Sequence, residues 1–298
     1  MLIVLRQLFI LYAFILVGWF LGKRNPTLSS HTGLLSYLLA NFLLPAKVFE
    51  TFANHFSISY LQNNQRMIII STVLVIALHY LSKIPAKYIA NTRYERNVYE
   101  YSFTIANFAF MGFALVEGLF GASGLADQIL FCIPFTIYTY TIGYVKLSGS
   151  GNPFLKLLNP MTAALVLGAA FGLMGIQLPE TICQVISTSS ACVGPMSMML
   201  TGLTLSAFPL HDMINDKQAY LVVSMRLLII PLFVFGIFHL CGFVDVLPAA
   251  ILAVAMPTAL NPIIFSEAAG ESPFLSARLA FLSHLLSIIT LPVWLMLL

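Results

Sequence analysis

The chain has 298 residues, of which 59% are hydrophobic and only 8% are charged, and its formal net charge is +3. Soluble domains carry roughly 25% charged residues, so the composition excludes an ordinary soluble domain and indicates a polytopic membrane protein in a lipid bilayer. The small net charge, without any long basic run, argues against a nucleic-acid partner.

Apolar stretches of about 20 residues, each long enough to cross the hydrocarbon core, alternate with short polar connections. They predict an all-α membrane protein with ten spanning helices, at residues 2–22, 33–53, 66–83, 101–120, 125–146, 158–175, 183–206, 218–240, 247–268 and 274–298. The first stretch is longer than the apolar core of a signal peptide and no cleavage-site pattern follows it, so we interpret it as a span.

The basic residues predict the orientation of these spans. Most Lys and Arg residues fall in the odd-numbered connections: Lys23, Arg24, Lys83, Lys87, Arg93, Arg96, Lys146, Lys156 and Lys217. The even-numbered connections after the fourth, sixth and eighth spans carry Asp127, Glu180 and Asp245 and no Lys or Arg. We therefore expect odd connections in the cytoplasm, both termini outside, and a multi-pass protein of the plasma membrane, which in bacteria is the inner membrane.

The two halves of the chain can be superimposed with a shift of 150 residues. This shift places Pro45 on Pro195 and Gly112 on Pro262, and the span starts agree. Because each half holds five spans, an odd number, the second half must enter the membrane from the opposite side. We therefore expect two inverted repeats, at 1–150 and 151–298, joined by a linker-like segment at 148–153.

Two spans at matching places in the two halves contain residues that interrupt helices. Gly112 lies in the fourth span, and Pro257 and Pro262 lie in the ninth. Glycine costs backbone entropy in a helix, and proline removes an N–H donor. Inside a bilayer the freed backbone groups must find partners or line a wet cavity, so paired interruptions indicate a transport site.

Polar side chains accompany both interruptions, namely Asn107, Thr258 and Asn261. An amide can donate to and accept from a substrate, and opened helix ends add N–H groups that suit a carboxylate. The alternative is that these side chains only satisfy the broken backbone. The predicted substrate-binding set is Asn107, Gly112, Pro257, Thr258, Asn261 and Pro262.

Ionisable residues within predicted spans are further candidates. Lys47 and Glu50 lie three residues apart on one helical face, so we expect them to pair with each other. Glu117 and Glu267 lie late in their spans, toward an interface.

Arg226 and Arg278 lie in the eighth and tenth spans. Each either faces inward, where an arginine can hold a carboxylate with two hydrogen bonds, or meets lipid phosphate near a span end. His79 and His284 either relay protons or form hydrogen bonds as bystanders.

Signatures of an enzyme are weak. Gly121-Ala-Ser-Gly124 matches the G-x-S-G of intramembrane serine proteases, with His284 as its conceivable base, but it falls at a predicted turn where small residues are expected. The four cysteines form no C-x-x-C pair and show no zinc-ligand spacing. We therefore predict a protein that is not an enzyme and needs no metal or cofactor.

Several segments resemble those of the auxin efflux carrier family. Asn107-Phe-Ala-Phe-Met-Gly-Phe-Ala114 is similar to its N-T-G-F-M-G-L-P stretch, and Leu43-Leu-Pro-Ala-Lys-Val-Phe49 to its L-L-P-A-L-I-F segment. Further similarities lie at Asn159-Pro160, Val193-Gly-Pro195, Ala255-Met-Pro257 and Thr290-Leu-Pro292. The order and spacing of these segments cover essentially the whole chain, and the short central loop resembles that of prokaryotic members.

The resemblance implies a scaffold made of spans 1, 2, 6 and 7 and a transport domain made of spans 3–5 and 8–10. It implies that spans 4 and 9 cross at their broken centres and bind a small organic anion there, such as malate, malonate or an auxin-like carboxylate. A coupling ion, H⁺ or Na⁺, and a homodimer are left open. The alternatives are a sodium-coupled symporter of the related bile-acid type and a membrane-embedded enzyme.

The fourth span departs from the family pattern. Ala114 stands where the family has proline, and Phe108-Ala109 stands where it has Thr-Gly. Gly112 is then the one residue of this span that weakens the helix, so we expect the interruption there.

Overall fold

A computed structural model describes residues 2–149, 152, 155 and 157–298. Helices make up the regular secondary structure of the described residues, apart from one isolated β-bridge between Ala106 and Thr258. The prediction of an all-α protein is therefore confirmed for this part of the chain.

The described helices of the first half include three π-helical turns, each of which passes directly into a following α-helix. In order they are α1 (Leu2–Arg24), α2 (Pro26–Ser30), α3 (Thr32–Leu38), η1 (Leu39–Leu43), α4 (Leu44–His55), α5 (Ile58–Ile89), α6 (Arg93–Thr104), η2 (Phe108–Gly112), α7 (Phe113–Tyr138), η3 (Thr139–Gly143) and α8 (Tyr144–Ser148). Polar caps fix several starts: the side chains of Ser57 and Thr92 accept backbone N–H groups at the first turns of α5 and α6.

The helices of the second half are shorter on average. They are α10 (Pro160–Met174), α11 (Glu180–Ala191), α12 (Val193–Ser206), α13 (Leu210–Ile214), α14 (Lys217–Ser224), η4 (Met225–Ile229), α15 (Ile230–Leu240), α16 (Leu247–Val254), α17 (Asn261–Ala268) and α18 (Phe274–Leu297). Asn159 caps α10 and Asp216 caps α14, each by accepting two backbone N–H groups.

Among the described residues, six helical runs are long and apolar enough to cross a membrane: Leu2–Arg24, Thr32–His55, Ile58–Ile89, Phe108–Ser148, Lys217–Leu240 and Phe274–Leu297. Within the fourth of these, Gly121 has φ 70° and ψ −167°, a conformation that glycine adopts readily and other residues do not. The chain therefore bends between the expected fourth and fifth spans. The other expected spans occur as shorter helices, and the count of ten stays a prediction.

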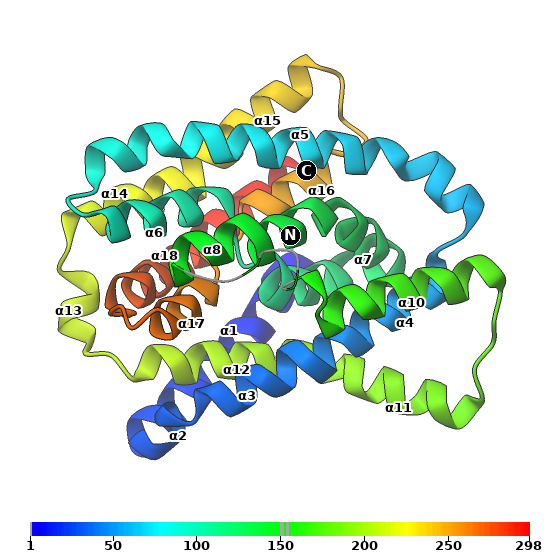
Figure 1. Cartoon of the computed structure of the whole chain (residues 1–298), viewed down its shortest axis with the longest axis horizontal. Helices are drawn as coiled ribbons and strands as arrows, with labels where there is room; N and C mark the ends of the chain where they lie inside the picture. Colours follow the sequence, from blue (N-terminus) through cyan, green and yellow to red (C-terminus); the bar gives the residue numbers. More distant parts are fainter. Residues whose placement is uncertain (1, 150–151, 153–154, 156) are drawn as a thin grey trace.

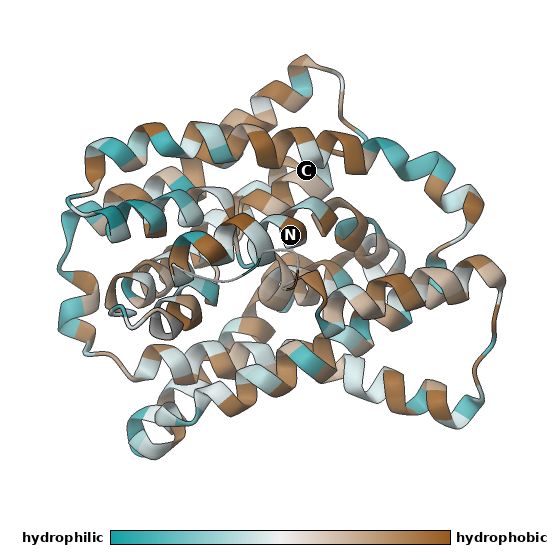
Figure 2. Cartoon of the chain, in the orientation of Figure 1, coloured by the Kyte–Doolittle hydropathy of each residue, from teal (hydrophilic) through white to brown (hydrophobic). Residues whose placement is uncertain are grey.

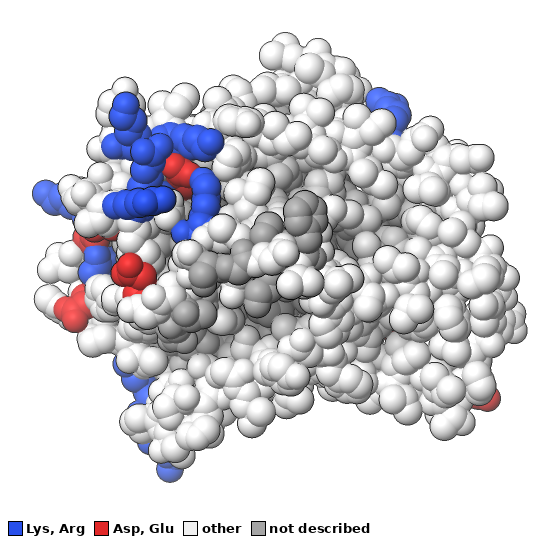
Figure 3. Space-filling model, in the orientation of Figure 1, with Lys and Arg blue, Asp and Glu red and all other residues white. Residues whose placement is uncertain are grey.

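Polar residues gather at the two ends of the molecule. In Figure 1, α5 runs across the full width, and α2, α6, α13 and α17 lie toward the left. Figure 2 shows hydrophilic residues at this left end and at the start of α5, with hydrophobic residues between them. Lys and Arg collect at the left end in Figure 3, where α5 passes into α6. We call this the basic end of the molecule.

Glycines allow two pairs of helices to approach closely. A methyl group at Gly202 of α12 would lie 2.0 Å from the carbonyl oxygen of Ile15 in α1, and one at Gly18 would lie 2.2 Å from that of Met199. Gly168 and Gly172 of α10 lie in the same way against the backbone of α4. Small residues are the usual means of helix association in a bilayer, since lipid removes the hydrophobic driving force.

We predict that Gly202→Ala lowers stability by roughly 1–3 kcal/mol, because the added methyl group forces α1 and α12 apart. Thermal unfolding in detergent measures the effect. Gly236→Ala in α15 is the matched control, since nothing lies within 4 Å of its methyl position. Equal melting temperatures for the two variants would contradict the close-packed interface.

Candidate functional site

Two helices are interrupted, and their breaks lie against each other. Between α6 and η2 the backbone is extended at Ile105, with φ −114° and ψ 126°. Ala106 forms the antiparallel bridge with Thr258, which lies in the break between α16 and α17. The N–H of Asn107 donates to the carbonyl of Pro257 at 2.8 Å. Each break therefore supplies hydrogen-bond partners for some of the backbone N–H and carbonyl groups that the other break leaves unpaired. A lipid environment requires such partners, because it offers none itself.

Side chains at the breaks bind α18. The amide nitrogen of Asn107 lies 3.3 Å from Nε2 of His284, whose Nδ1 donates to the carbonyl of Ala280 at 2.7 Å. This arrangement fits a neutral imidazole that accepts from the amide. The N–H and hydroxyl of Thr258 lie 3.0 Å and 2.9 Å from the hydroxyl of Ser283. Asn107 and Thr258 are both buried.

The remaining candidates contribute mainly backbone. Gly112 donates its N–H to the carbonyl of Asn107 at 3.0 Å and ends the π-helical turn that follows the break. The carbonyl of Pro262 accepts from the hydroxyl of Ser266. The interruption in the fourth span thus lies five residues before Gly112, because pairing with the ninth span, rather than the glycine, ends α6.

A small cavity adjoins the breaks. It has a volume of about 30 Å³ and is lined by Asn107, Asn261 and Tyr140 among others, which is room enough for a water molecule. A larger cavity of about 360 Å³ shares Tyr140 and Asn261 with it and extends along α3 to Ser29 and Gly33. Asn107 and Asn261 therefore line one cavity, and the larger cavity, which shares Asn261 with it, reaches α2 and α3, whose ribbons lie toward the lower left in Figure 1.

The expected pairing of Lys47 with Glu50 is wrong. Nζ of Lys47 donates to a carboxylate oxygen of Glu117 at 2.6 Å and lies 3.4 Å from the hydroxyl of Ser190. Lys47 is 1% exposed because it faces α7 and α11, whereas Glu117 is 41% exposed. The packing of α4 against α7 thus places Glu117 of another helix, and not Glu50 of the next turn, against Lys47.

The two arginines differ in their surroundings. Arg278 binds the carboxylate of Asp216 and donates to the carbonyl of Asp212 at 3.0 Å. Arg226 is fully buried, and Nη1 donates to the carbonyl of Phe103 at 3.2 Å. Arg278 thus has a structural partner at the basic end.

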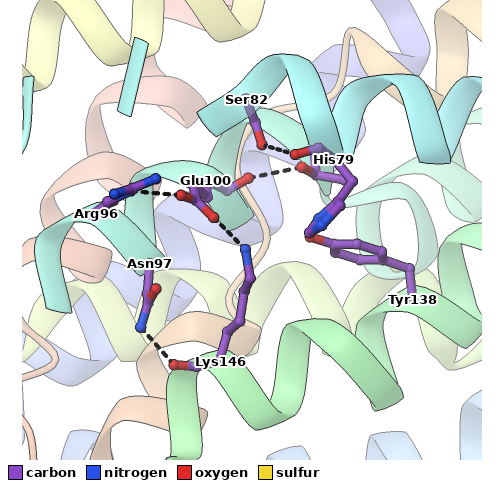
Figure 4. Close-up of polar contacts among 8 residues, drawn as sticks. His79, Ser82, Arg96, Asn97, Glu100, Tyr138 and Lys146 are labelled. Atoms are coloured by element: carbon purple, nitrogen blue, oxygen red, sulfur yellow. Dashed lines mark hydrogen bonds and ion pairs between the residues drawn. The ribbon is translucent and has the colours of Figure 1, made fainter. Parts of the chain in front are cut away.

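A buried carboxylate organises the basic end, as Figure 4 shows. Glu100 of α6 accepts from Nε of Arg96 at 2.9 Å and from Lys146 of α8. Nearby, Nδ1 of His79 lies 2.9 Å from the hydroxyl of Tyr138, so this histidine has a hydrogen-bond partner. Glu100 is not among the residues predicted from the sequence, although its spacing of four residues from Arg96 is typical of a helical ion pair.

The pKa of Glu100, which lies just before the fourth predicted span, is shifted by two opposing effects. Burial raises it, but the hydrogen bonds and positive charges of Lys146 and Arg96 outweigh burial and hold the pKa below its ordinary value. The carboxylate is therefore charged at neutral pH and joins α6 to α8.

The serine protease alternative receives no support from the described geometry. Ser123 is exposed beside the bend at Gly121. His284 is buried, and its two ring nitrogens contact Asn107 and Ala280. The structure does not bring this serine and this histidine into a nucleophile–base pair.

The helical architecture and the paired breaks are those of a membrane transport protein. The family described as membrane transport protein matches residues 3–157 and again residues 153–295, so the chain belongs to it. This is the auxin efflux carrier family, in agreement with the segments noted in the sequence.

Two relatives extend this similarity. An uncharacterized transporter of Methanothermobacter thermautotrophicus is 29% identical over 195 residues, which span 63% of this chain and 63% of that relative. The uncharacterized transporter YfdV of Escherichia coli K12 is 24% identical over 297 residues, covering 94% of this chain and 92% of YfdV.

We predict that Glu100→Gln destabilises the protein by about 1–3 kcal/mol at pH 7, because charge-assisted hydrogen bonds are lost. The folded-state pKa of Glu100 is depressed, so its contribution is complete above the unfolded-state pKa of about 4.3 and is lost as pH falls through the lower folded-state value. Detergent-solubilised unfolding at several pH values measures this. Glu271→Gln, an exposed carboxylate at the same end, is the control; a difference that does not shrink in acid would contradict the assignment.

Proposed function

We propose that this protein is a secondary transporter that carries a small organic anion by alternating access at the two paired breaks. The observation that carries the proposal is the contact between Asn107 and Pro257, beside a cavity that Asn107 and Asn261 both line. Non-helical backbone at membrane depth is tolerated where it is buried in protein or lines a cavity, and transporters place their substrate sites there.

The chemistry of the breaks favours an anion. The helical segments that begin at Phe108 and Asn261 direct their N-terminal ends, and so their positive dipole ends, toward the breaks. The amides of Asn107 and Asn261 add donors. These groups suit a carboxylate such as malate, malonate or an auxin-like acid, as the family resemblance implies.

The packing supports two inverted repeats, 1–150 and 151–298. Gly18 lies against Met199, and Gly168 lies against Phe49. A shift of 150 residues places Gly18 on Gly168 and Phe49 on Met199, so it converts one contact into the other. The same shift places Asn107 on Pro257. This self-matching pattern is what a two-fold axis through the breaks would produce.

We further propose that α1, α4, α10 and α12 belong to the scaffold and that the helices around the breaks move against it. The larger cavity begins near Gly33, whereas Lys47 lies 14 residues further along the same helical run, which is about 21 Å. The ion pair of Lys47 with Glu117 then joins scaffold to moving domain on the far side of the breaks. With the basic end in the cytoplasm, this conformation is open inward.

Transport itself is tested with purified protein in proteoliposomes. Uptake of a panel of mono- and dicarboxylates would be measured with and without a sodium gradient and with and without a pH gradient. The sodium arm tests the bile-acid-type alternative, and the pH arm tests proton coupling. A protein that moves none of these anions under any gradient would refute the proposed function.

We predict that Asn107→Ala abolishes carboxylate uptake while the protein still folds, because the variant removes an amide that lines the small cavity. The expected loss is at least about a hundredfold, in line with one well-placed charge-assisted hydrogen bond of ~3 kcal/mol. Asn64→Ala is the control, because the amide of Asn64 donates to the carbonyl of Tyr60 within the first turns of α5. Uptake at the wild-type rate with Asn107→Ala would rule out this site.

We predict that Glu117→Gln weakens the far-side contact and populates the alternative conformation about fivefold more, equivalent to ~1 kcal/mol. The reporter is a cysteine introduced by Ala114→Cys, at a position that is 7% exposed and lies beside Gly194. The native Cys183, Cys192 and Cys241 are changed to serine so that they do not react. Its labelling by a membrane-impermeant maleimide should accelerate by the same factor. Glu180→Gln, an exposed acid on α11, is the control, and unchanged labelling with Glu117→Gln would contradict the role of the ion pair.

A further inference from the structure

Arg226 is the largest fully buried side chain of the described chain, with no exposed area. Its Nη1 donates to the carbonyl of Phe103 in the last turn of α6. Its Nε and Nη2 are buried and have no hydrogen-bond partner among the described residues. These two nitrogens form one edge of the guanidinium, the edge whose spacing matches the two oxygens of a carboxylate.

The other buried charges of the described chain have counter-charges. Lys47 has the carboxylate of Glu117, and Glu100 has Arg96 and Lys146. Arg226 has only a backbone carbonyl, together with the negative dipole end of α6, which amounts to roughly half a charge. A buried cation without a full counter-charge is unfavourable, so such groups inside membranes mark substrate pathways.

Contacts with the surrounding helices hold this guanidinium against the C-terminal end of α6. Phe103, its partner, lies four residues before Asn107 on the helix that ends at the break. Arg226 itself lies in the π-helical turn η4, a type of turn frequent at functional sites. The next residue, Leu227, accepts a hydrogen bond at its carbonyl from the indole of Trp294 at 2.8 Å.

We propose that Arg226 is the residue that makes the site selective for anions: its charge is neutralised by the carboxylate of the bound substrate. The inference rests on the proposed function and adds the residue that sets the charge of the substrate. Empty, this part of the protein holds one uncompensated positive charge; loaded with a carboxylate, it is neutral. A neutral analogue of the same shape leaves Arg226 uncompensated and binds less well.

The test compares malonate with its neutral diamide, malonamide, as competitors of uptake and as stabilisers in thermal unfolding. Arg226→Gln keeps a donor for the carbonyl of Phe103 but removes the charge, whereas Arg226→Lys keeps the charge but removes the planar fork. We expect the preference of the wild type for malonate to fall at least about tenfold in Arg226→Gln and to stay within about threefold in Arg226→Lys. Arg66→Gln, which removes an exposed arginine paired with Asp245, should leave the preference unchanged.

Each outcome has a defined meaning. A folded Arg226→Gln that keeps the wild-type preference shows that Arg226 only caps α6, and it overturns the inference while leaving the proposed function intact. Should Arg226→Gln not fold, Arg226→Lys decides, because a loss of the preference despite the retained charge also overturns the inference. A wild-type protein that neither carries nor is stabilised by any carboxylate of the panel overturns the proposed function and the inference together.

Discussion

The hydrogen bond from Asn107 to Pro257 is the constraint on which the rest of the site depends. Two helices that stop within the membrane leave N–H and carbonyl groups that lipid cannot satisfy. The antiparallel bridge between Ala106 and Thr258 lets each break supply partners to the other. Neither interruption is tolerable alone, which explains why the breaks occur as a pair and why they meet.

The helical interfaces far from the breaks serve a different purpose. At Gly18, Gly168, Gly172 and Gly202 there is no room for a side chain, and backbone lies directly on backbone. Lipid tails are as apolar as leucine, so these interfaces depend on close van der Waals contact. Contacts of this kind do not deform gradually. Close contacts of this kind within the pairs α1–α12 and α4–α10 are what the scaffold of our proposal requires.

Much of the fold is accessible from the sequence, because an apolar stretch of about 20 residues has few alternatives to a helix in lipid. The spacing of four residues between Gly168 and Gly172 is likewise typical of close helix packing, and both glycines lie against the backbone of α4. What failed depended on contacts between distant segments. The interrupted stretch around Asn107 and Gly112 was visible, but no local signal predicts that α6 ends at Thr104, shortly before Asn107 pairs with the ninth span. Lys47 was assigned to Glu50 because only their spacing was visible, and Glu117 lies 70 residues away in sequence.

The charges around the breaks are ordered in a way that no single motif reveals. The described polar side chains at the breaks are amides, hydroxyls and an imidazole, and none is a carboxylate. The described side chains there offer a cation no counter-charge, whereas Arg226 at the end of α6 and the N-terminal ends of η2 and α17 favour negative charge. Glu100 and Glu117, two acids close in sequence to the first break, are already engaged by lysines. The anion selectivity that we propose would therefore depend on where the carboxylates are paired as much as on the groups that line the cavity.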